Sequence, residues 1–306
     1  MLDRDQLETF ATVLKLQSFE RAASHLHLSK GAISQRVSAL EESLSRTLIV
    51  RERPIRATSH GERLLRYVQA LRIMEAEAIA AMASGTQPGK AIQIVLGSHA
   101  DSMSTWFSGI LFDMAKRMAV SLQLVIEEPA AMLSMLQRGE LFGCVSSSPT
   151  VPRGFSSDAL GVLRYRCVAE PRFVDRAFAS GFALPSVLQA HALMIGNHHS
   201  YHAMFLEQFF GFAVTSYPQH SLPTPEARLD AIRCGIGYGF LPEMQVREQL
   251  QNGQLVDLLP ESNFDVDLYW HQMVVDSSSS QQIRLHVNER AKEHLHRRIP
   301  GLVLSA

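Results

Sequence analysis

Cysteine is scarce in this 306-residue sequence, and its three cysteines lie far apart. Cys144, Cys167 and Cys234 form neither a metal-binding nor a redox spacing, and their odd number suits a reducing compartment. We expect them to be buried and inert, with a redox-sensing pair as the alternative.

Long apolar runs and a secretory leader are also lacking. The first residues, Met1-Leu-Asp-Arg-Asp-Gln, do not show the basic and then apolar pattern of a signal peptide. No stretch approaches the roughly 18 uninterrupted apolar residues of a membrane helix. We therefore expect a cytoplasmic protein with no membrane partner.

The chain has almost no net charge, because 29 basic residues face 30 acidic ones. This balance excludes a protein that binds nucleic acid or an anionic membrane through its overall charge, so any affinity for DNA must be local. The segment from Lys30 to Arg66 holds eight basic residues against four acidic ones. Phosphate groups would be neutralised there.

Length and composition indicate a folded chain of several domains. A chain of 306 residues is too long for one ordinary core, so we expect two or three domains. With 46% hydrophobic and 19% charged residues, global disorder and collagen-like repetition are excluded. Ser84-Gly-Thr-Gln-Pro-Gly-Lys90 predicts a helix stop followed by a flexible joint, which marks a domain boundary.

Three short helices are predicted near the N-terminus. Residues 5–16 have apolar side chains at helical spacing, with Asp5 at a capping-box-like start. Ser18 and Ser29 are expected to cap the second and third helices. The apolar face of the third helix leaves four polar side chains near its outward N-terminal side, namely Lys30, Ser34, Gln35 and Arg36.

The order of these helices favours DNA binding over a small bundle that binds nothing. A helix with the small residues Ala22 and Ala23 is followed by a tight turn and by a polar-faced helix beginning at Lys30. Ser, Gln and Arg side chains hydrogen-bond base edges in the major groove, and a helix N-terminus suits a phosphate. The pattern is typical of a helix-turn-helix.

A short two-stranded wing is predicted at residues 47–58, where apolar and basic residues alternate around Pro54. Ser59 and Glu62 then form a capping box that opens a long helix. An apolar stripe on so long a helix usually finds a partner helix, and a second copy of the chain is the simplest partner. The stripe comprises Leu64, Val68, Leu71, Ala78 and Met82. In the wing, the arginines that could contact DNA phosphates are Arg51, Arg53 and Arg56.

The rest of the chain alternates strands, polar loops and helices, which predicts an α/β fold with parallel strands. The strand segments are 92–96, 121–126, 142–146, 192–195 and 236–241. Ligands of such sheets bind beyond the carboxyl ends of the strands. The loops of interest are therefore 97–102, 127–128, 146–148, 196–202 and 224–226.

Four motifs between residues 19 and 62 carry a family resemblance. They are Phe19-Glu-Arg-Ala-Ala, Leu28-Ser-Lys-Gly-Ala-Ile-Ser-Gln-Arg-Val-Ser-Ala-Leu-Glu, Leu48-Ile-Val-Arg and Thr58-Ser-His-Gly-Glu. This run resembles the LysR-type transcriptional regulators. The resemblance implies that Lys30, Ser34 and Gln35 lie near the bases, and that the DNA backbone is approached by Arg36, Arg51, Arg53 and Thr58.

The resemblance also implies partners. Proteins of this type are homodimers or homotetramers that dimerise through the long helix and bind pseudo-palindromic operators in double-stranded DNA. They sense a small-molecule effector, and RNA polymerase is a further candidate partner. No cofactor and no catalysis are expected.

The implied fold class is multidomain: an all-α winged helix-turn-helix with a long linker helix, then an α/β effector domain of two subdomains that is similar to periplasmic binding proteins. Two crossover strands would join these subdomains, with the chain leaving the first near Leu163 and returning near Ser277. The effector would bind in the cleft between them. The expected bounds are 1–58 for the winged domain, 59–84 for the linker helix, 85–90 for a hinge, 91–163 with 277–306 for the first effector subdomain, and 164–276 for the second.

Short matches to one branch of this family are spread along the effector part. They are Ala100-Asp-Ser102, Thr105-Trp106, Glu127-Glu128, Arg138-Gly-Glu140, Leu255-Val-Asp-Leu and Tyr269-Trp-His271. They resemble the branch that controls basic amino acid export in response to lysine or arginine. Ser98, Ser102 and the helix N-terminus beside them suit a carboxylate, whereas the acidic side chains suit an ammonium or guanidinium group. The expected effector-binding residues are Ser98, Asp101, Ser102, Glu127, Glu128, Ser147, Asn197, His198 and Glu226.

Several alternatives stay open for these residues. Gly196-Asn-His-His-Ser200 stands where that branch leads us to expect acidic residues, so a different effector and target gene is the alternative. Asp101 could instead cap a helix, and the two glutamates could be solvated loop charges. His198 and His202 stand four residues apart, but no cysteine or carboxylate has a matching metal-ligand spacing, so we expect polar histidines rather than a metal site.

Other classes of protein are disfavoured by missing motifs. An enzyme would need the sequence motif of a nucleophile elbow, a phosphate loop or a paired acid and base, and we recognise none of these motifs in the sequence. A transported solute-binding protein would carry a signal peptide and no helix-turn-helix. An effector-independent DNA-coating protein is the remaining alternative, and its binding would depend on salt with little sequence preference.

Overall fold

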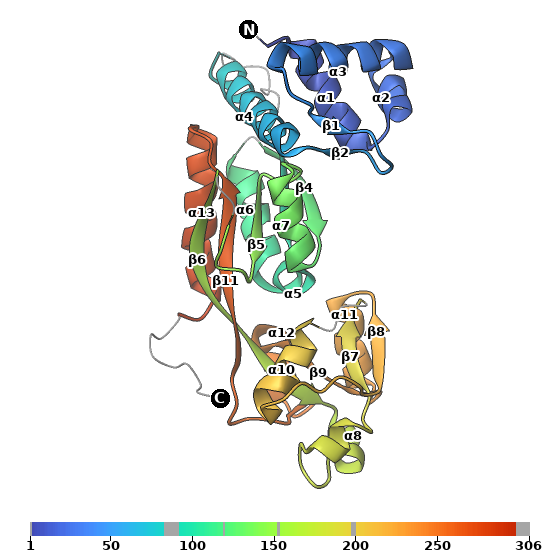
Figure 1. Cartoon of the computed structure of the whole chain (residues 1–306). Coiled ribbons are helices and arrows are strands. Elements are labelled where there is room, and N and C mark those ends of the chain that lie inside the picture. The colour runs from blue at the N-terminus through green and yellow to red at the C-terminus, as the bar shows by residue number, and fades with distance from the viewer. Residues whose placement is uncertain (1, 83–91, 119, 152–153, 197–199, 298–306) are drawn as a thin grey trace.

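The structure is a computed structural model that describes residues 2–82, 92–118, 120–151, 154–196 and 200–297. A helical domain lies at one end of an elongated molecule, a long helix follows it, and a two-lobed domain extends away from both (Figure 1). This arrangement confirms the multidomain fold class expected from the sequence. The expected hinge at 85–90 lies outside the described residues.

The helical domain contains the three predicted helices. They are α1 (Arg4–Leu16), α2 (Phe19–Leu26) and α3 (Lys30–Leu44). Ser18 and Ser29 cap α2 and α3, because each side chain accepts a hydrogen bond from a backbone N–H three residues on. The cap of α1 is Asp3, whose Oδ1 lies 2.9 Å from Gln6 N, so the expected start at Asp5 was wrong by two residues.

One carboxylate of α3 holds the wing against the helices. Strands β1 (Ile49–Val50) and β2 (Arg56–Ala57) pair antiparallel, as predicted for the wing. Glu41 Oε1 accepts hydrogen bonds from the backbone N–H groups of Leu48 at 2.7 Å and Ile49 at 3.2 Å. Leu48, Ile49 and Ile55 are buried in the same core as the three helices. The wing is therefore part of that core.

Thr58, rather than the expected Ser59, caps the long helix α4 (Ser59–Met82). Its Oγ1 accepts a hydrogen bond from Gly61 N at 3.1 Å and donates one to Thr47 O at 2.8 Å. Leu64 and Val68 of the expected apolar stripe are buried in the core of the helical domain. The large apolar side chains of α4 that are exposed include Tyr67, Met74, Ile79 and Met82, and Ala78 of the expected stripe is exposed as well.

The same helix also contacts the two-lobed effector domain. Ile73 belongs to the core of that domain. Arg66 Nη1 donates to Gln137 O at 2.8 Å, and its guanidinium lies 5.6 Å from the centre of the Phe155 ring. Glu77 Oε1 accepts a hydrogen bond from Ser279 N at 2.6 Å. Helix α4 is thus packed on both sides of the domain boundary.

One sheet runs through both lobes of the effector domain, in the order β4-β3-β5-β11-β6-β9-β7-β8, with β10 paired to β6. Strands β3, β4 and β5 are parallel to one another, as are β7, β8 and β9, which agrees with the predicted parallel strands. The bounds are β3 (Ile92–Ser98), β4 (Val120–Ile126), β5 (Gly143–Ser146), β6 (Phe155–Ala169), β7 (Ala192–Ile195), β8 (Gln219–Leu222), β9 (Tyr238–Pro242), β10 (Val256–Asp257) and β11 (Phe264–Met273).

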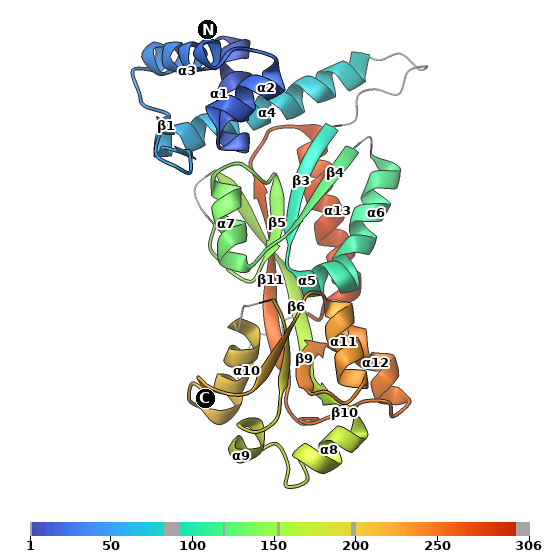
Figure 2. The same cartoon turned by 90° about the vertical axis from the view of Figure 1, so that its right-hand side faces the viewer.

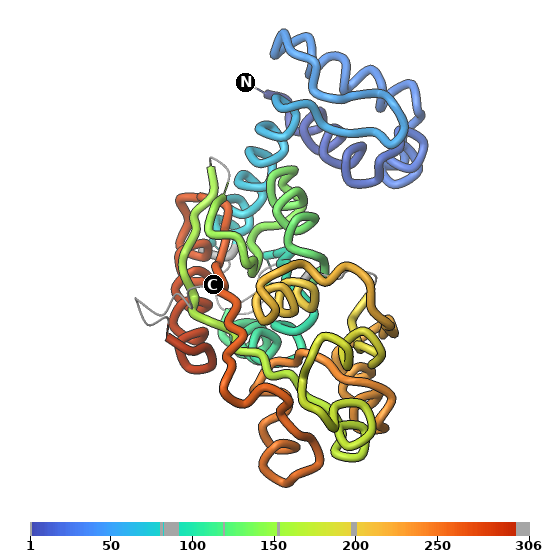
Figure 3. Tube along the Cα trace, turned by 60° about the horizontal axis from the view of Figure 1, so that its bottom comes forward, coloured from blue at the N-terminus to red at the C-terminus, as the bar shows by residue number. Residues whose placement is uncertain are grey.

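Strands β6 and β11 cross between the lobes side by side (Figure 3). Both run antiparallel to their neighbours, β11 pairing with β5 in the first lobe and β6 with β9 in the second. Both strands are continuous through the two lobes. Tyr269–Gln272 of β11 pair with β5 of the first lobe.

Helices cover the sheet in each lobe, as Figure 2 shows. The first lobe, here called subdomain I, carries α5 (Ala100–Ser102), the π-helical turn η1 (Met103–Phe107), α6 (Ser108–Arg117), α7 (Pro129–Gln137) and α13 (Ser278–His294). The second lobe, subdomain II, carries α8 (Pro171–Ala177), α9 (Leu184–Val187), α10 (Ser200–Phe210), α11 (Pro225–Arg233) and α12 (Glu243–Gln251).

The cysteines differ in burial. Cys144 and Cys167 are buried, and burial raises the pKa of the Cys144 thiol to about 12, which keeps it protonated. Cys234 is exposed, so the expectation that all three are buried was wrong for this residue. In the described part of the chain, no helix has the length and apolar character needed to cross a membrane.

We predict that Gly61→Ala destabilises the helical domain. A Cβ at Gly61 would lie 2.1 Å from Leu48 O, and this oxygen belongs to backbone that is fixed by the wing. The free energy of unfolding in urea, followed by circular dichroism, should fall by about 1–3 kcal/mol. Gly109→Ala is the control, because nothing lies within 4 Å of the Cβ position there. Equal losses in the two variants would contradict the clash.

Candidate functional site

A pocket opens between the two subdomains. Subdomain I contributes the residues after β3 and β4, at the carboxyl ends of these strands as expected. Strand β6 and subdomain II form the opposite side. The lining residues are His99, Ala100, Asp101 and Glu128 from subdomain I, Tyr165 from β6, and Leu193, Met194, Ile195, Tyr201, His202, Phe205, Arg228 and Phe240 from subdomain II.

His99 fixes the backbone on the subdomain I side. Its Nδ1 accepts a hydrogen bond from Ser102 N at 3.2 Å, so His99 caps α5 and the alternative of Asp101 as the cap is wrong. The tautomer with hydrogen on Nε2 follows, and Nε2 lies 3.0 Å from Ser102 Oγ. Ser102 Oγ also accepts from Trp106 Nε1 at 2.9 Å. Burial lowers the pKa of His99 to about 4, which keeps the imidazole neutral near pH 7.

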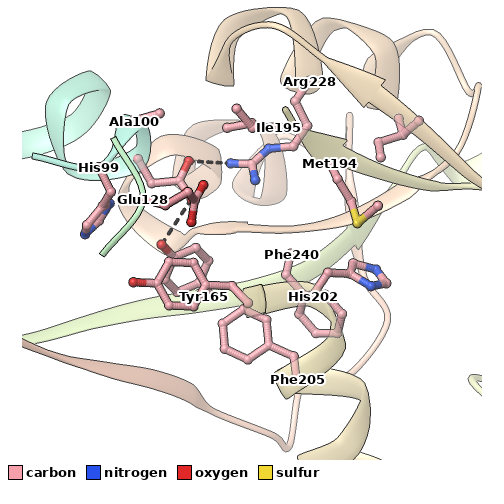
Figure 4. A pocket seen from close by; sticks show the side chains of 13 residues that line it. His99, Ala100, Glu128, Tyr165, Met194, Ile195, His202, Phe205, Arg228 and Phe240 are labelled. Atoms are coloured by element: carbon pink, nitrogen blue, oxygen red, sulfur yellow. Dashed lines mark hydrogen bonds and ion pairs between the residues drawn. The ribbon is translucent and has the colours of Figure 1, made fainter. Parts of the chain in front are cut away.

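Asp101 joins the two subdomains through a buried ion pair. Arg228 Nη2 of α11 donates to Asp101 Oδ1 at 2.6 Å, and Tyr165 Oη of β6 donates to Oδ2 at 3.0 Å. The Asp101 and Arg228 side chains are 8% and 7% exposed. Both contacts are drawn as dashed lines in Figure 4. Because its two oxygens each accept a hydrogen bond, Asp101 is held in one orientation.

Glu128 adds a second carboxylate to the pocket. It stands at the N-cap position of α7 but makes no side-chain cap hydrogen bond there. It is half-buried and lies in the same part of the pocket as Arg228 (Figure 4). With His99 neutral, the two carboxylates face one guanidinium, so the charged groups of the lining carry one excess negative charge.

Aromatic rings form the floor of the pocket. The centre of the Phe205 ring lies 5.1 Å from that of Tyr165 and 4.9 Å from that of Phe240. Tyr201 belongs to the same group of rings, and burial raises the pKa of its hydroxyl to about 12, so it is neutral. Aromatic faces attract cations. A pocket with excess carboxylate above aromatic rings is suited to a cationic ligand.

The expected effector residues divide into three groups. Asp101 and Glu128 line the pocket. Ser98 and Ser102 are fully buried and do not line it, and the half-buried Ser147 and the exposed Glu127 and Glu226 also lie outside the lining. Asn197 and His198 lie outside the described residues.

Arg228, His99 and Tyr165 were missed by sequence reasoning. Arg228 lies 127 positions after Asp101, and no local pattern links the two. His202 of the expected histidine pair hydrogen-bonds Tyr217 through Nδ1 at 3.0 Å. Among the described residues, no group of three or more histidine, cysteine or acidic side chains could hold a metal ion.

The expected DNA-binding residues lie on α3, the wing and the start of α4. Gln35 and Arg53 are exposed, and Ser34 is half-buried. The other four residues have partners within the domain: Lys30 pairs with Glu20, Arg36 with Asp5 at 2.9 Å, Arg51 with Glu41 at 3.4 Å, and Thr58 caps α4.

Comparison with known proteins covers nearly the whole chain. The family profile described as bacterial regulatory helix-turn-helix protein, lysR family, matches residues 4–62, and that of the LysR substrate binding domain matches residues 91–291. The HTH-type transcriptional regulator ArgP of Aeromonas salmonicida is 32% identical over 282 residues, which are 92% of this chain and 94% of that one.

Two solved structures are similar to this one. The crystal structure of ArgP from Mycobacterium tuberculosis has a TM-score of 0.84 and 33% identity, covering 98% of this chain and 100% of that chain. Full-length LysG from Corynebacterium glutamicum with bound effector Arg has a TM-score of 0.79 and 29% identity, covering 96% and 100% of the two chains.

The buried neutral His99 predicts a loss of stability in acid. Its pKa falls from 6.5 in the unfolded chain to about 4 in the folded one, so the unfolded state binds more protons between these values. This contribution to stability is complete above pH 6.5 and declines as the pH falls toward 4, by on the order of 3 kcal/mol. In His99→Asn, which keeps a capping side chain, urea unfolding from pH 7 to 4.5 should show a smaller pH slope. Equal slopes would contradict a neutral His99.

Proposed function

Because this chain belongs to the LysR family of transcription regulators, we propose that its DNA binding responds to a basic amino acid, lysine or arginine, and that it controls the gene of an amino acid exporter. The target gene is proposed by analogy with the branch that the sequence resembles. We propose no enzymatic activity, and we place the protein in the cytoplasm with its DNA.

The observation that carries the choice of effector is the charge of the pocket. Asp101 and Glu128 supply two carboxylates against the one guanidinium of Arg228, above a floor of aromatic rings. A lysine or arginine molecule carries one net positive charge, so its binding neutralises the buried site. An acidic ligand would instead add to the excess charge and pay a larger desolvation cost.

The similarity to LysG supports the same choice. That protein was solved with arginine as its bound effector, and the similarity spans 96% of this chain. The pocket described here lies between the two subdomains that the substrate-binding profile covers.

A neutral amino acid is the second candidate effector. Arg228 already neutralises Asp101, which leaves Glu128 as the one lining carboxylate without an ion pair among the described residues. An α-ammonium group alone could satisfy Glu128. In that case the regulator would have a different effector and a different target.

The winged domain is the proposed DNA-binding unit. We propose that Lys30, Ser34 and Gln35 lie near the bases of a pseudo-palindromic operator in double-stranded DNA. The proposed contacts to the backbone are Arg36, Arg51, Arg53 and Thr58. The exposed positions of Gln35 and Arg53 support this assignment, and Arg36 and Thr58 in addition have partners within the domain that hold them in place.

Helix α4 supports a homodimer or homotetramer. Tyr67, Met74 and Ile79 expose apolar surface along this helix, and a second copy of the helix would cover it. We propose that two winged domains are paired in this way on the operator. RNA polymerase is a further proposed partner.

Helix α7 offers a route from the pocket to α4. It begins next to Glu128, which lines the pocket, and ends at Gln137, whose carbonyl accepts the hydrogen bond from Arg66. A shift of α7 on effector binding would therefore move the contact point of α4. We propose that the spacing of the paired winged domains changes by this route.

We predict selective binding of basic amino acids. In calorimetric titrations of the full-length protein, L-arginine or L-lysine should bind. The neutral analogues L-citrulline, which is isosteric with arginine, and L-norleucine, which is lysine without its ammonium group, should bind far more weakly. Glu128→Gln should lower the affinity for the basic amino acid about 10- to 100-fold, because a charge-assisted contact is lost.

Glu127→Gln is the matched control for this titration. It removes the same charge one residue earlier, at an exposed position outside the pocket lining, so it should leave affinity unchanged. Equal affinity of citrulline and arginine would overturn the basic effector and favour a neutral amino acid.

We predict separate roles for Gln35 and Arg53 on an operator fragment that the wild-type protein selects from genomic DNA. Gln35→Ala should lower the ratio of operator to random-DNA affinity about 10- to 100-fold, because a base contact is lost. Arg53→Ala should weaken both affinities alike and reduce the slope of log affinity against log salt by about 1. Fluorescence anisotropy at several salt concentrations measures both effects. A uniform loss in Gln35→Ala would rule out its base contact.

A further inference from the structure

Arg228 is buried in the wall of the pocket, but its hydrogen-bonding capacity is only partly used. The residue is 6% exposed, and Asp101 accepts one hydrogen bond from its Nη2. The buried Arg228 Nε has no hydrogen-bond partner among the described residues. A guanidinium group carries five N–H donors, and a buried donor without an acceptor is costly. The unfilled donors indicate that a ligand group completes this site.

Asp101 fixes the orientation of this guanidinium but does not accept hydrogen bonds from all of its N–H donors. One oxygen of Asp101 accepts from Arg228, and the other accepts from Tyr165, so the contact between Asp101 and Arg228 is a single hydrogen bond rather than a two-pronged one. The remaining edge of the guanidinium is left for a second acceptor. A carboxylate matches that edge in charge and geometry.

The two subdomains therefore present opposite charges to a ligand. Arg228 stands on α11 of subdomain II, whereas Glu128 stands at the start of α7 in subdomain I. A ligand with a carboxylate at one end and a cationic group at the other would bridge the subdomains, because each end meets its counter-charge on a different subdomain. A ligand with cationic groups alone would meet Glu128 but would be repelled by Arg228.

We propose that Arg228 binds the α-carboxylate of the effector and so makes the site specific for α-amino acids against their decarboxylated amines. This inference rests on the proposed function only in placing the effector in this pocket. It adds a specificity-determining residue that sequence reasoning did not identify. It also gives Asp101 a different role from the expected one, because Asp101 then positions Arg228 and need not contact the side chain of the effector.

The test compares each amino acid with its own decarboxylated amine. L-Arginine and agmatine, and L-lysine and cadaverine, are titrated calorimetrically into the full-length wild-type protein and its variants. Wild type should bind the amino acid at least about 10- to 100-fold more tightly than the amine, which is the range expected for a charge-assisted contact. In Arg228→Met this preference should disappear, because the amino acid loses affinity while the amine does not.

Control variants separate ligand binding from damage to the fold. Arg233→Met removes the same charge from the exposed end of α11 and should keep the wild-type preference. Arg228→Lys keeps the positive charge and should keep a reduced preference. The double variant Asp101→Asn with Arg228→Met leaves no unpaired buried carboxylate, so it tests the preference if Arg228→Met alone does not fold.

The outcomes distinguish this inference from the proposed function. If another amino acid of the common twenty binds and the basic ones do not, the basic effector fails, and the same comparison is made with that amino acid and its amine. Equal affinity for acid and amine in wild type, or an unchanged preference in Arg228→Met and the double variant, would overturn the role of Arg228. A protein that binds none of these compounds would overturn both.

Discussion

Ten residue pairs between the antiparallel strands β6 and β11 tie the two effector subdomains together. Every side of the pocket is positioned relative to this ribbon, because β6 supplies Tyr165 and the flanking strands supply the subdomain walls. The register shifts once, between Leu268 and Tyr269, at a point between the rows paired with β5 and those paired with β9. A bulge there increases the local twist of the ribbon. The angle between the pocket walls thus depends on two shared strands.

The buried charges of the pocket make sense as a binding device. An ion pair such as Asp101–Arg228 seldom contributes more to stability than well-packed apolar side chains would, because both groups lose their hydration. Here the pair holds a guanidinium in a fixed orientation between two subdomains. Neutral His99 secures the backbone beside it without adding charge. The cost of burial is therefore offset by preorganisation for a charged ligand.

Local chemistry made much of the fold predictable. The caps Ser18 and Ser29 and the apolar spacing of the first helices depend on neighbouring residues, so the sequence displays them directly. Competing local caps caused small errors, because Asp3 and Thr58 act where Asp5 and Ser59 were expected. The parallel strands were recognised as apolar segments. The long crossover strands were expected only from the family resemblance. Their regular pairing is interrupted between the subdomains, where the register shifts at Leu268 and Tyr269.

The site was less predictable because its contacts are distant in sequence. Asp101 and Glu128 were expected in the pocket and line it, as acidic residues after parallel strands. Arg228, the partner of Asp101, could not be inferred from the sequence. Helix α11 belongs to the second subdomain, and it lies beside Asp101 only because the two subdomains face each other in the fold. Ser98 and Ser102 suit a carboxylate by type, but both are fully buried, which only the packing of β3 and η1 reveals.

The burial of Leu64 and Val68 against the wing and α1–α3 has a practical consequence for dissecting the protein. A fragment that stops at residue 58 would leave this apolar surface open and remove the helix that closes it. An autonomous DNA-binding fragment has to retain about the first three and a half turns of α4, through Leu71, which packs against the same core. The functional unit of the N-terminus is thus longer than its helix-turn-helix and wing, and part of it is the helix that also contacts the effector domain.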